Sequence, residues 1–143
     1  MHRIILGILS CFALSACSIA PDTVVMKDVN VSDWSEAVSI EFNNDSEQER
    51  NLSIALHVNS HFEAKQIALQ IKTFSPDSLY HTEQVSLPCT AYLSQTTARA
   101  VDVEIPYRCN VSLRHKGKYI FEITPLESIA GVEAAGINFQ ADK

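Results

Sequence analysis

The fold is decided by two stretches of sequence, Val38-Ser39-Ile40-Glu41-Phe42 and Leu52-Ser53-Ile54-Ala55-Leu56-His57-Val58. In both, large apolar side chains recur at every second position, which is the period of a strand with one buried face. The polar segment Asn44 to Arg50 separates the two stretches. We therefore expect residues 38–43 and 52–58 to form a β-hairpin.

The same alternation continues along most of the chain. Turn residues such as Pro76-Asp77-Ser78 and Lys116-Gly117-Lys118 separate the alternating runs. A helix is conceivable only near residues 64–69, where β-branched neighbours favour a strand. Further strands are predicted at residues 23–31, 67–71, 80–87, 101–105 and 119–123 and around Ile137 and Phe139. About eight strands at this spacing predict an all-β chain folded as an antiparallel β-sandwich of jelly-roll type.

The first residues have the features of a secretory signal. A basic start at Arg3 precedes the apolar run Ile4 to Leu14, which is shorter than the roughly 20 residues of a membrane-spanning helix. The run ends in Leu14-Ser15-Ala16-Cys17, which resembles the lipobox of bacterial lipoproteins. We predict that residues 1–16 are cleaved and that Cys17 carries the lipid, palmitate included. The alternative is an ordinary cleaved signal with a chance cysteine.

The mature chain has the length of one domain and an acidic charge. Removing the first sixteen of the 143 residues leaves 127, which we divide into a lipidated tether at 17–21 and a single domain at 22–143. Ten Lys and Arg then stand against seventeen Asp and Glu, a formal charge of −7. This balance disfavours nucleic acid and gives no polybasic help at an anionic membrane, so the lipid does the anchoring. Because Ser18 is not acidic, the expected location is the outer membrane, facing the periplasm.

Two cysteines remain in the mature domain. Envelope compartments oxidise thiols, so Cys89 and Cys109 are predicted to form a disulfide that closes a loop of about twenty residues and adds about 3 kcal/mol. The alternative is two separately buried free cysteines.

No catalytic motif or cofactor motif occurs in the chain. His57 and His61 have a zinc-like spacing, but four residues of a strand span about 13 Å, so we expect two solvent-facing histidines. Asp45, Glu47 and Glu49 resemble a calcium loop without the glycine that such a loop needs, and a solvated hairpin tip is the preferred interpretation. No cofactor, metal or catalytic residue is expected.

Trp34, the single tryptophan, has two possible roles. It could be a stacking platform for a sugar ring and thus a ligand contact. The other interpretation is that it closes one end of the sandwich as a core residue.

From Trp34 onward the chain resembles the gliding-motility lipoprotein H family of the Bacteroidetes. The resemblance is carried by residues 34–42, 51–59, 117–123 and 129–137, together with a terminal Lys143. It implies a noncatalytic component of the cell envelope, near gliding or type IX secretion machinery. It implies no catalytic residues.

Two functions therefore follow from the sequence. The first is a structural or protein-docking lipoprotein, bound to the membrane by its lipid and to another envelope protein by its β domain. The alternative is a lipid-anchored module that binds a glycan or a peptide. A flat apolar patch or an exposed strand edge would favour docking, and a groove lined by Trp34 and tyrosines would favour a sugar.

Overall fold

The computed structural model describes residues 22–90 and 101–141, so the predicted signal and Cys17 lie outside the described residues. None of the described residues belongs to a helix of the length and apolarity that a membrane crossing requires. The described residues form eight strands: β1 (Thr23–Asp28), β2 (Val38–Asn44), β3 (Arg50–Val58), β4 (Gln66–Phe74), β5 (Tyr80–Pro88), β6 (Val101–Val111), β7 (Gly117–Pro125) and β8 (Val132–Ala141).

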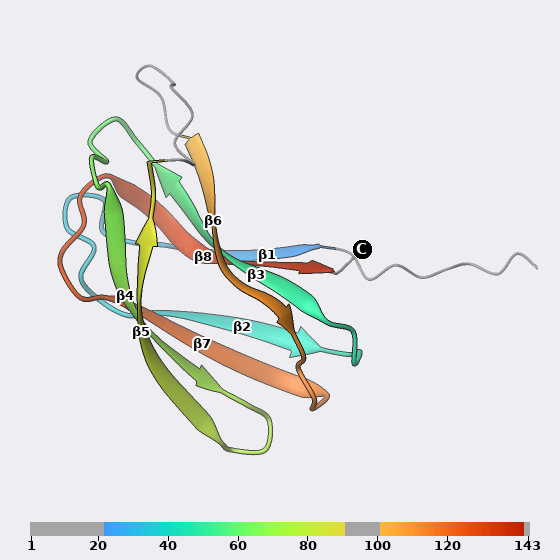
Figure 1. Ribbon diagram of the computed structural model, residues 1–143. Coiled ribbons are helices and arrows are strands. Elements are labelled where there is room, and N and C mark those ends of the chain that lie inside the picture. The colour runs from blue at the N-terminus through green and yellow to red at the C-terminus, as the bar shows by residue number, and fades with distance from the viewer. Residues whose placement is uncertain (1–21, 91–100, 142–143) are drawn as a thin grey trace, which may run out of the picture.

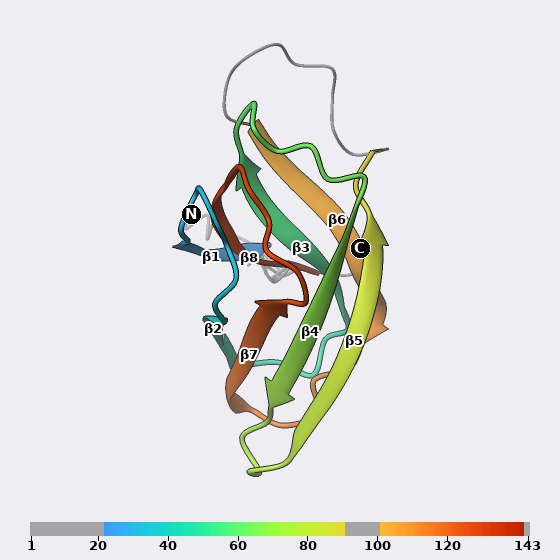
Figure 2. The ribbon, with the colours of Figure 1, turned by 90° about the vertical axis from the view of Figure 1, so that its left-hand side faces the viewer.

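The eight strands form two four-stranded antiparallel sheets packed face to face (Figures 1 and 2). The first sheet has the order β1-β8-β3-β6 and the second has the order β2-β7-β4-β5. Sequence neighbours mostly alternate between the sheets, which is the strand order of a jelly roll. The predicted all-β sandwich of about eight strands is confirmed.

The predicted hairpin between β2 and β3 is wrong. Ile40 of β2 lies opposite Phe121 of β7 in the second sheet, whereas Ile54 of β3 lies between Ile105 of β6 and Ile137 of β8 in the first. The segment 45–49 therefore crosses from one sheet to the other. The two strands share a pattern because both sheets turn one face to the same core, and alternation does not say which sheet a strand joins.

The core lies between the sheets and consists mainly of the alternating apolar side chains. Phe139 stacks on Phe42 with ring centroids 4.1 Å apart, and Phe121 approaches Phe139 at 5.4 Å. One charged side chain enters this core: Arg50, 3% exposed, has its guanidinium carbon 5.0 Å from the centroid of Phe42. Within the described part of the chain, its Nε and Nη1 have no hydrogen-bond partner.

The sandwich has two unlike ends. At the terminal end, the backbone N–H of Ala141 donates to the Asp22 carboxylate at 3.1 Å. In the first sheet, Arg50 of β3 lies opposite both Ala141 of β8 and Val111 of β6. This end holds the connections 45–49, 75–79 and 112–116, and the opposite, distal end holds the connections 29–37, 59–65 and 126–131. Both described termini, Asp22 and Ala141, thus lie at one end.

Candidate functional site

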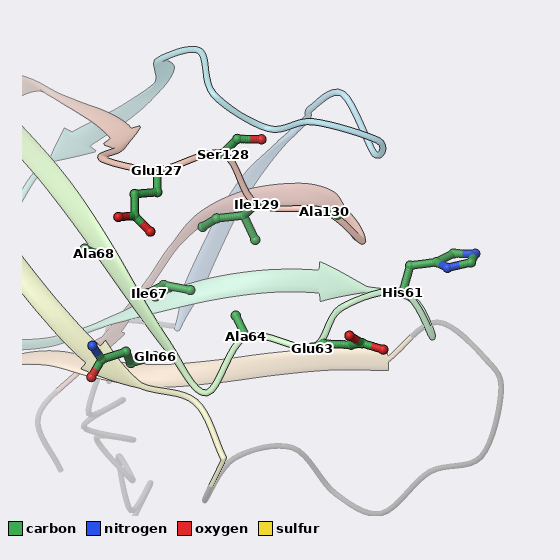
Figure 3. A pocket seen from close by; sticks show the side chains of 10 residues that line it. All are labelled: His61, Glu63, Ala64, Gln66, Ile67, Ala68, Glu127, Ser128, Ile129 and Ala130. Atoms are coloured by element: carbon green, nitrogen blue, oxygen red, sulfur yellow. The ribbon is translucent and has the colours of Figure 1, made fainter.

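The distal end contains a hollow of about 410 Å³. Figure 3 shows its two walls: Glu127 to Ala130 from the β7–β8 connection on one side, and, leading into β4 on the other, His61, Glu63, Ala64 and Gln66 to Ala68. Ile67 and Ile129 supply apolar surface between these walls, while Glu63, Gln66 and Glu127 supply polar groups.

Local hydrogen bonds hold the walls of this hollow in place. The Asn59 side chain accepts from the backbone N–H of His61 at 2.9 Å, an Asx turn that reverses the chain after β3. The backbone N–H of Asn59 donates to Gly131 O at 2.9 Å. Gly131 has a φ of +85°, and a Cβ there would lie 2.3 Å from the Phe62 nitrogen. Glycine thus permits the close packing of the two connections.

A second hollow, of about 390 Å³, lies beside the first and is lined by residues 28–30 and 33–38. The two hollows are separated by paired backbone hydrogen bonds between Trp34 and Ile129, at 3.0 and 3.1 Å. The Ser128 hydroxyl donates to the Asp33 carboxylate across the same boundary. The three distal connections are therefore bonded into one surface.

The surface of the two hollows is acidic. Among the described residues, two carboxylates line the first hollow, three line the second, and no Lys or Arg lines either: Glu63, Glu127, Asp28, Asp33 and Glu36. Among residues 22–90 and 101–141 no group of three or more His, Cys, Asp or Glu side chains could hold a metal ion. The surface is suited to cationic groups on a partner. We did not predict it from the sequence, where the only signal was acidic residues in three separate turns.

Trp34 is a core residue in the structure. The side chain is 1% exposed, and its Nε1–H donates to the backbone oxygen of Glu36 at 3.0 Å. Although Trp34 contributes to the second hollow, its ring is not displayed as a platform for a sugar. Of the two predicted roles, the structure favours closure of the sandwich end.

The predicted disulfide between Cys89 and Cys109 is absent. Cys89 is buried and free, and Cys109 is exposed and free. Tyr107 and Arg108 of β6 both donate to the Glu83 carboxylate of β5, which fixes how the two strands pass each other. Cys109 follows these residues, whereas Cys89 lies six residues beyond Glu83, about 20 Å along the strand. A disulfide requires Cα atoms within roughly 4.4–6.8 Å, so the two thiols cannot pair here.

Both histidines face solvent, as expected: His57 lies half-buried on the outer face of the first sheet, and His61 is exposed in the loop after β3. His57 is not isolated, because its Nδ1 lies 2.7 Å from the Asp102 carboxylate and its Nε2 3.4 Å from that of Glu133. Cross-strand neighbours on β6 and β8 therefore orient the ring.

The acidic residues Asp45, Glu47 and Glu49 are exposed, as predicted. They do not form a hairpin tip, because they lie on the crossover between the two sheets.

Comparison of the chain with protein-family models, with curated proteins and with solved structures gives no match.

Proposed function

We propose that the chain is a lipid-anchored, noncatalytic protein of the cell envelope whose β-sandwich holds another envelope protein. The observation that carries this proposal is the acidic distal surface, where the described residues give two adjoining hollows five carboxylates and no lining Lys or Arg. Such a surface complements the Lys and Arg side chains of a protein partner.

The predicted lipid on Cys17 supports the same proposal. The tether enters the domain at Asp22, at the terminal end, and the acidic hollows lie at the opposite end. A membrane-bound partner could then meet the distal surface at a high effective concentration, so a modest interface would suffice. The resemblance to gliding-motility lipoprotein H, and hence a place near gliding or type IX secretion machinery, belongs to this proposal.

The alternative is a glycan-binding or peptide-binding module. A sugar site usually offers an aromatic face, and within residues 22–90 and 101–141 Trp34, which is 1% exposed, is the one Trp, Tyr or Phe that lines either hollow. The distal surface is therefore better suited to a basic protein segment than to a sugar ring.

The test is crosslinking of the tagged lipoprotein in intact envelopes, followed by purification and identification of the partner. In a Glu63→Gln, Glu127→Gln variant we expect the crosslinked partner to fall at least about tenfold, because charge complementarity is lost. The matched control is Asp45→Asn, Glu49→Gln, which removes two exposed carboxylates from the terminal end.

A glycan array run beside the crosslinking separates the two functions. Specific glycan binding without a reproducible protein partner would replace the docking proposal with the alternative. Equal loss of the partner in both carboxylate variants would show that the distal surface is not the contact.

A further inference from the structure

The terminal end displays the two most exposed large apolar side chains among the described residues, Leu79 and Tyr80, each 67% exposed. They lie at the turn of the β4–β5 hairpin, which projects at the bottom of Figures 1 and 2. Tyr80 packs beside Phe74 with ring centroids 6.0 Å apart, and Lys72 Nζ lies 5.1 and 5.0 Å from the two rings. The turn thus presents a preformed apolar and aromatic surface to solvent.

Basic side chains adjoin this turn. The β6–β7 connection packs against it, because a Cβ added at Gly117 would lie 3.1 Å from Pro76 and His115 Nε2 lies 3.4 Å from the Asp77 carboxylate. This connection exposes Arg114 and Lys116. Lys72, Arg114 and Lys116 stand here against two carboxylates, Asp77 of the turn and Glu122 opposite Lys72, so the charge is locally positive although the chain is acidic overall. We call these six residues the hairpin patch: Lys72, Phe74, Leu79, Tyr80, Arg114 and Lys116.

The chain leading to Cys17 enters at the same end of the sandwich. Asp22 accepts a hydrogen bond from the backbone of Ala141. Ala141 lies opposite Arg50, and Arg50 lies opposite Val111, the last residue before the β6–β7 connection. Five residue steps separate Asp22 from Cys17, which limits their Cα separation to about 18 Å. A lipid on Cys17 would hold this end of the domain next to the membrane.

We propose that the hairpin patch rests on the phospholipid interface in which the Cys17 lipid is embedded. The inference uses the lipidation that forms part of the proposed function. Tyrosine beside leucine and phenylalanine suits the boundary between headgroups and acyl chains, where an amphipathic ring keeps its hydroxyl in water. Arg114, Lys116 and Lys72 add attraction to anionic headgroups.

Acidic groups at the same end limit the contact to the hairpin side. The β2–β3 connection exposes Asp45, Glu47 and Glu49, and Asn44 bonds it to the β6–β7 connection through Leu113 O at 2.9 Å. These carboxylates are repelled by anionic headgroups, so the domain tilts toward the β4–β5 turn. The lipid supplies the affinity, and the hairpin patch sets an orientation in which the acidic hollows face away from the membrane.

The first test measures this orientation. Acylated protein, verified by mass at Cys17, is placed in phosphatidylethanolamine–phosphatidylglycerol vesicles and labelled with a fluorophore at Leu79→Cys or, as a control at the distal end, at Leu126→Cys. Both variants carry Cys109→Ser, which removes the exposed native thiol. We expect lipid-embedded nitroxides to quench the label at position 79 and not at position 126. Equal quenching, or stronger quenching at 126, would overturn the proposal.

The second test needs neither acylation nor a protein partner. A chain from Ser18 keeps all eight strands, and its partition into the same vesicles at millimolar lipid can be measured by flotation. Leu79→Ser, Tyr80→Ser should lower the partition coefficient at least about tenfold, because burial of both apolar side chains is lost. The matched control, Val31→Ser, Leu126→Ser, removes exposed apolar side chains from the distal end and should leave partition unchanged. Equal partition of both variants would contradict the membrane contact.

Discussion

Arg50 is a buried cation whose guanidinium packs on an aromatic ring. Its guanidinium lies over Phe42, and its Nε and Nη1 have no hydrogen-bond partner in the described part of the chain. A cation–π contact contributes up to about 2 kcal/mol, while removing an ion from water costs several kcal/mol. The cost of taking the guanidinium out of water therefore exceeds what its contact with Phe42 contributes to stability.

The first prediction is that Arg50→Met raises the free energy of unfolding by about 1 kcal/mol, because Met fills a similar volume without a charge. Urea denaturation measures the change. Arg50→Ala is the comparison and should lose about 2 kcal/mol by leaving a cavity beside Phe42. A loss of more than about 1 kcal/mol in the Met variant would mean that the guanidinium has an internal partner, such as an ordered water.

At the scale of single strands, Glu83 of β5 and its two hydrogen-bond donors on β6, Tyr107 and Arg108, form a cluster. This Glu83 cluster joins β5 to β6, the edge strands of opposite sheets. Burial alone would raise the pKa of Glu83. The hydrogen bonds from Tyr107 and Arg108 lower the pKa by more than burial raises it, so the pKa lies below its ordinary value of 4.5. Burial, with the same carboxylate as neighbour, raises the pKa of Tyr107. The cluster is therefore stabilised in the form with Glu83 ionised and Tyr107 protonated.

The second prediction follows from the lowered pKa of Glu83. A lowered folded-state pKa stabilises the protein above the unfolded pKa, and this stabilisation disappears as the pH falls through the folded value. Wild type should exceed Glu83→Gln in free energy of unfolding at pH 7, and the difference should shrink below about pH 4.5. Denaturation at pH values from 3 to 7 measures this difference in free energy of unfolding. The difference between wild type and Tyr107→Phe should change less with pH than the difference between wild type and Glu83→Gln. A constant gap between wild type and Glu83→Gln would show that the carboxylate is not stabilised by these donors.

The third prediction concerns two thiols, that of Cys89, which follows β5, and that of Cys109, which lies in β6. Cys109 is exposed on β6, whereas Cys89 is buried after β5 and burial raises the pKa of its thiol. Because the thiolate is the reactive form, folded protein should be alkylated rapidly at Cys109 and at Cys89 only after unfolding. Mass mapping without reductant checks this outcome. An intramolecular Cys89–Cys109 disulfide in the purified protein would contradict this prediction.

The sequence predicted strands better than it predicted their neighbours. Val38, Ile40 and Phe42 alternate because one face of β2 is buried, and that information is local. Whether β2 pairs with β3 or with β7 depends on contacts between residues far apart in the sequence, such as Ile40 with Phe121. The same limit explains the cysteine error, since the spacing of Cys89 and Cys109 gives a loop length but not how β5 and β6 pass each other.

At the scale of the whole molecule, the candidate sites could not be predicted because each combines distant segments. Glu63 and Glu127 line one hollow only after the β3–β4 and β7–β8 connections come together. Leu79 and Tyr80 gave a local signal, apolar residues at a turn, but the packing of the β6–β7 connection, with Arg114, against that turn depends on the jelly-roll topology. Trp34 was ambiguous in sequence because only the fold decides how much of its ring is exposed.

The last prediction joins the anchor to the two ends of the sandwich. Cys17→Ala should abolish labelling by radioactive palmitate and leave an uncleaved or soluble product, because the thiol that accepts the lipid is gone. The β-domain should keep its circular dichroism spectrum, since every described contact lies within residues 22–141. Crosslinking of the envelope partner should fall as well, although the acidic hollows are intact, because the co-anchored partner is no longer met at high effective concentration. Normal palmitate labelling of this variant would exclude Cys17 as the lipidated residue, and unchanged crosslinking of an unlabelled variant would show that docking does not depend on the tether.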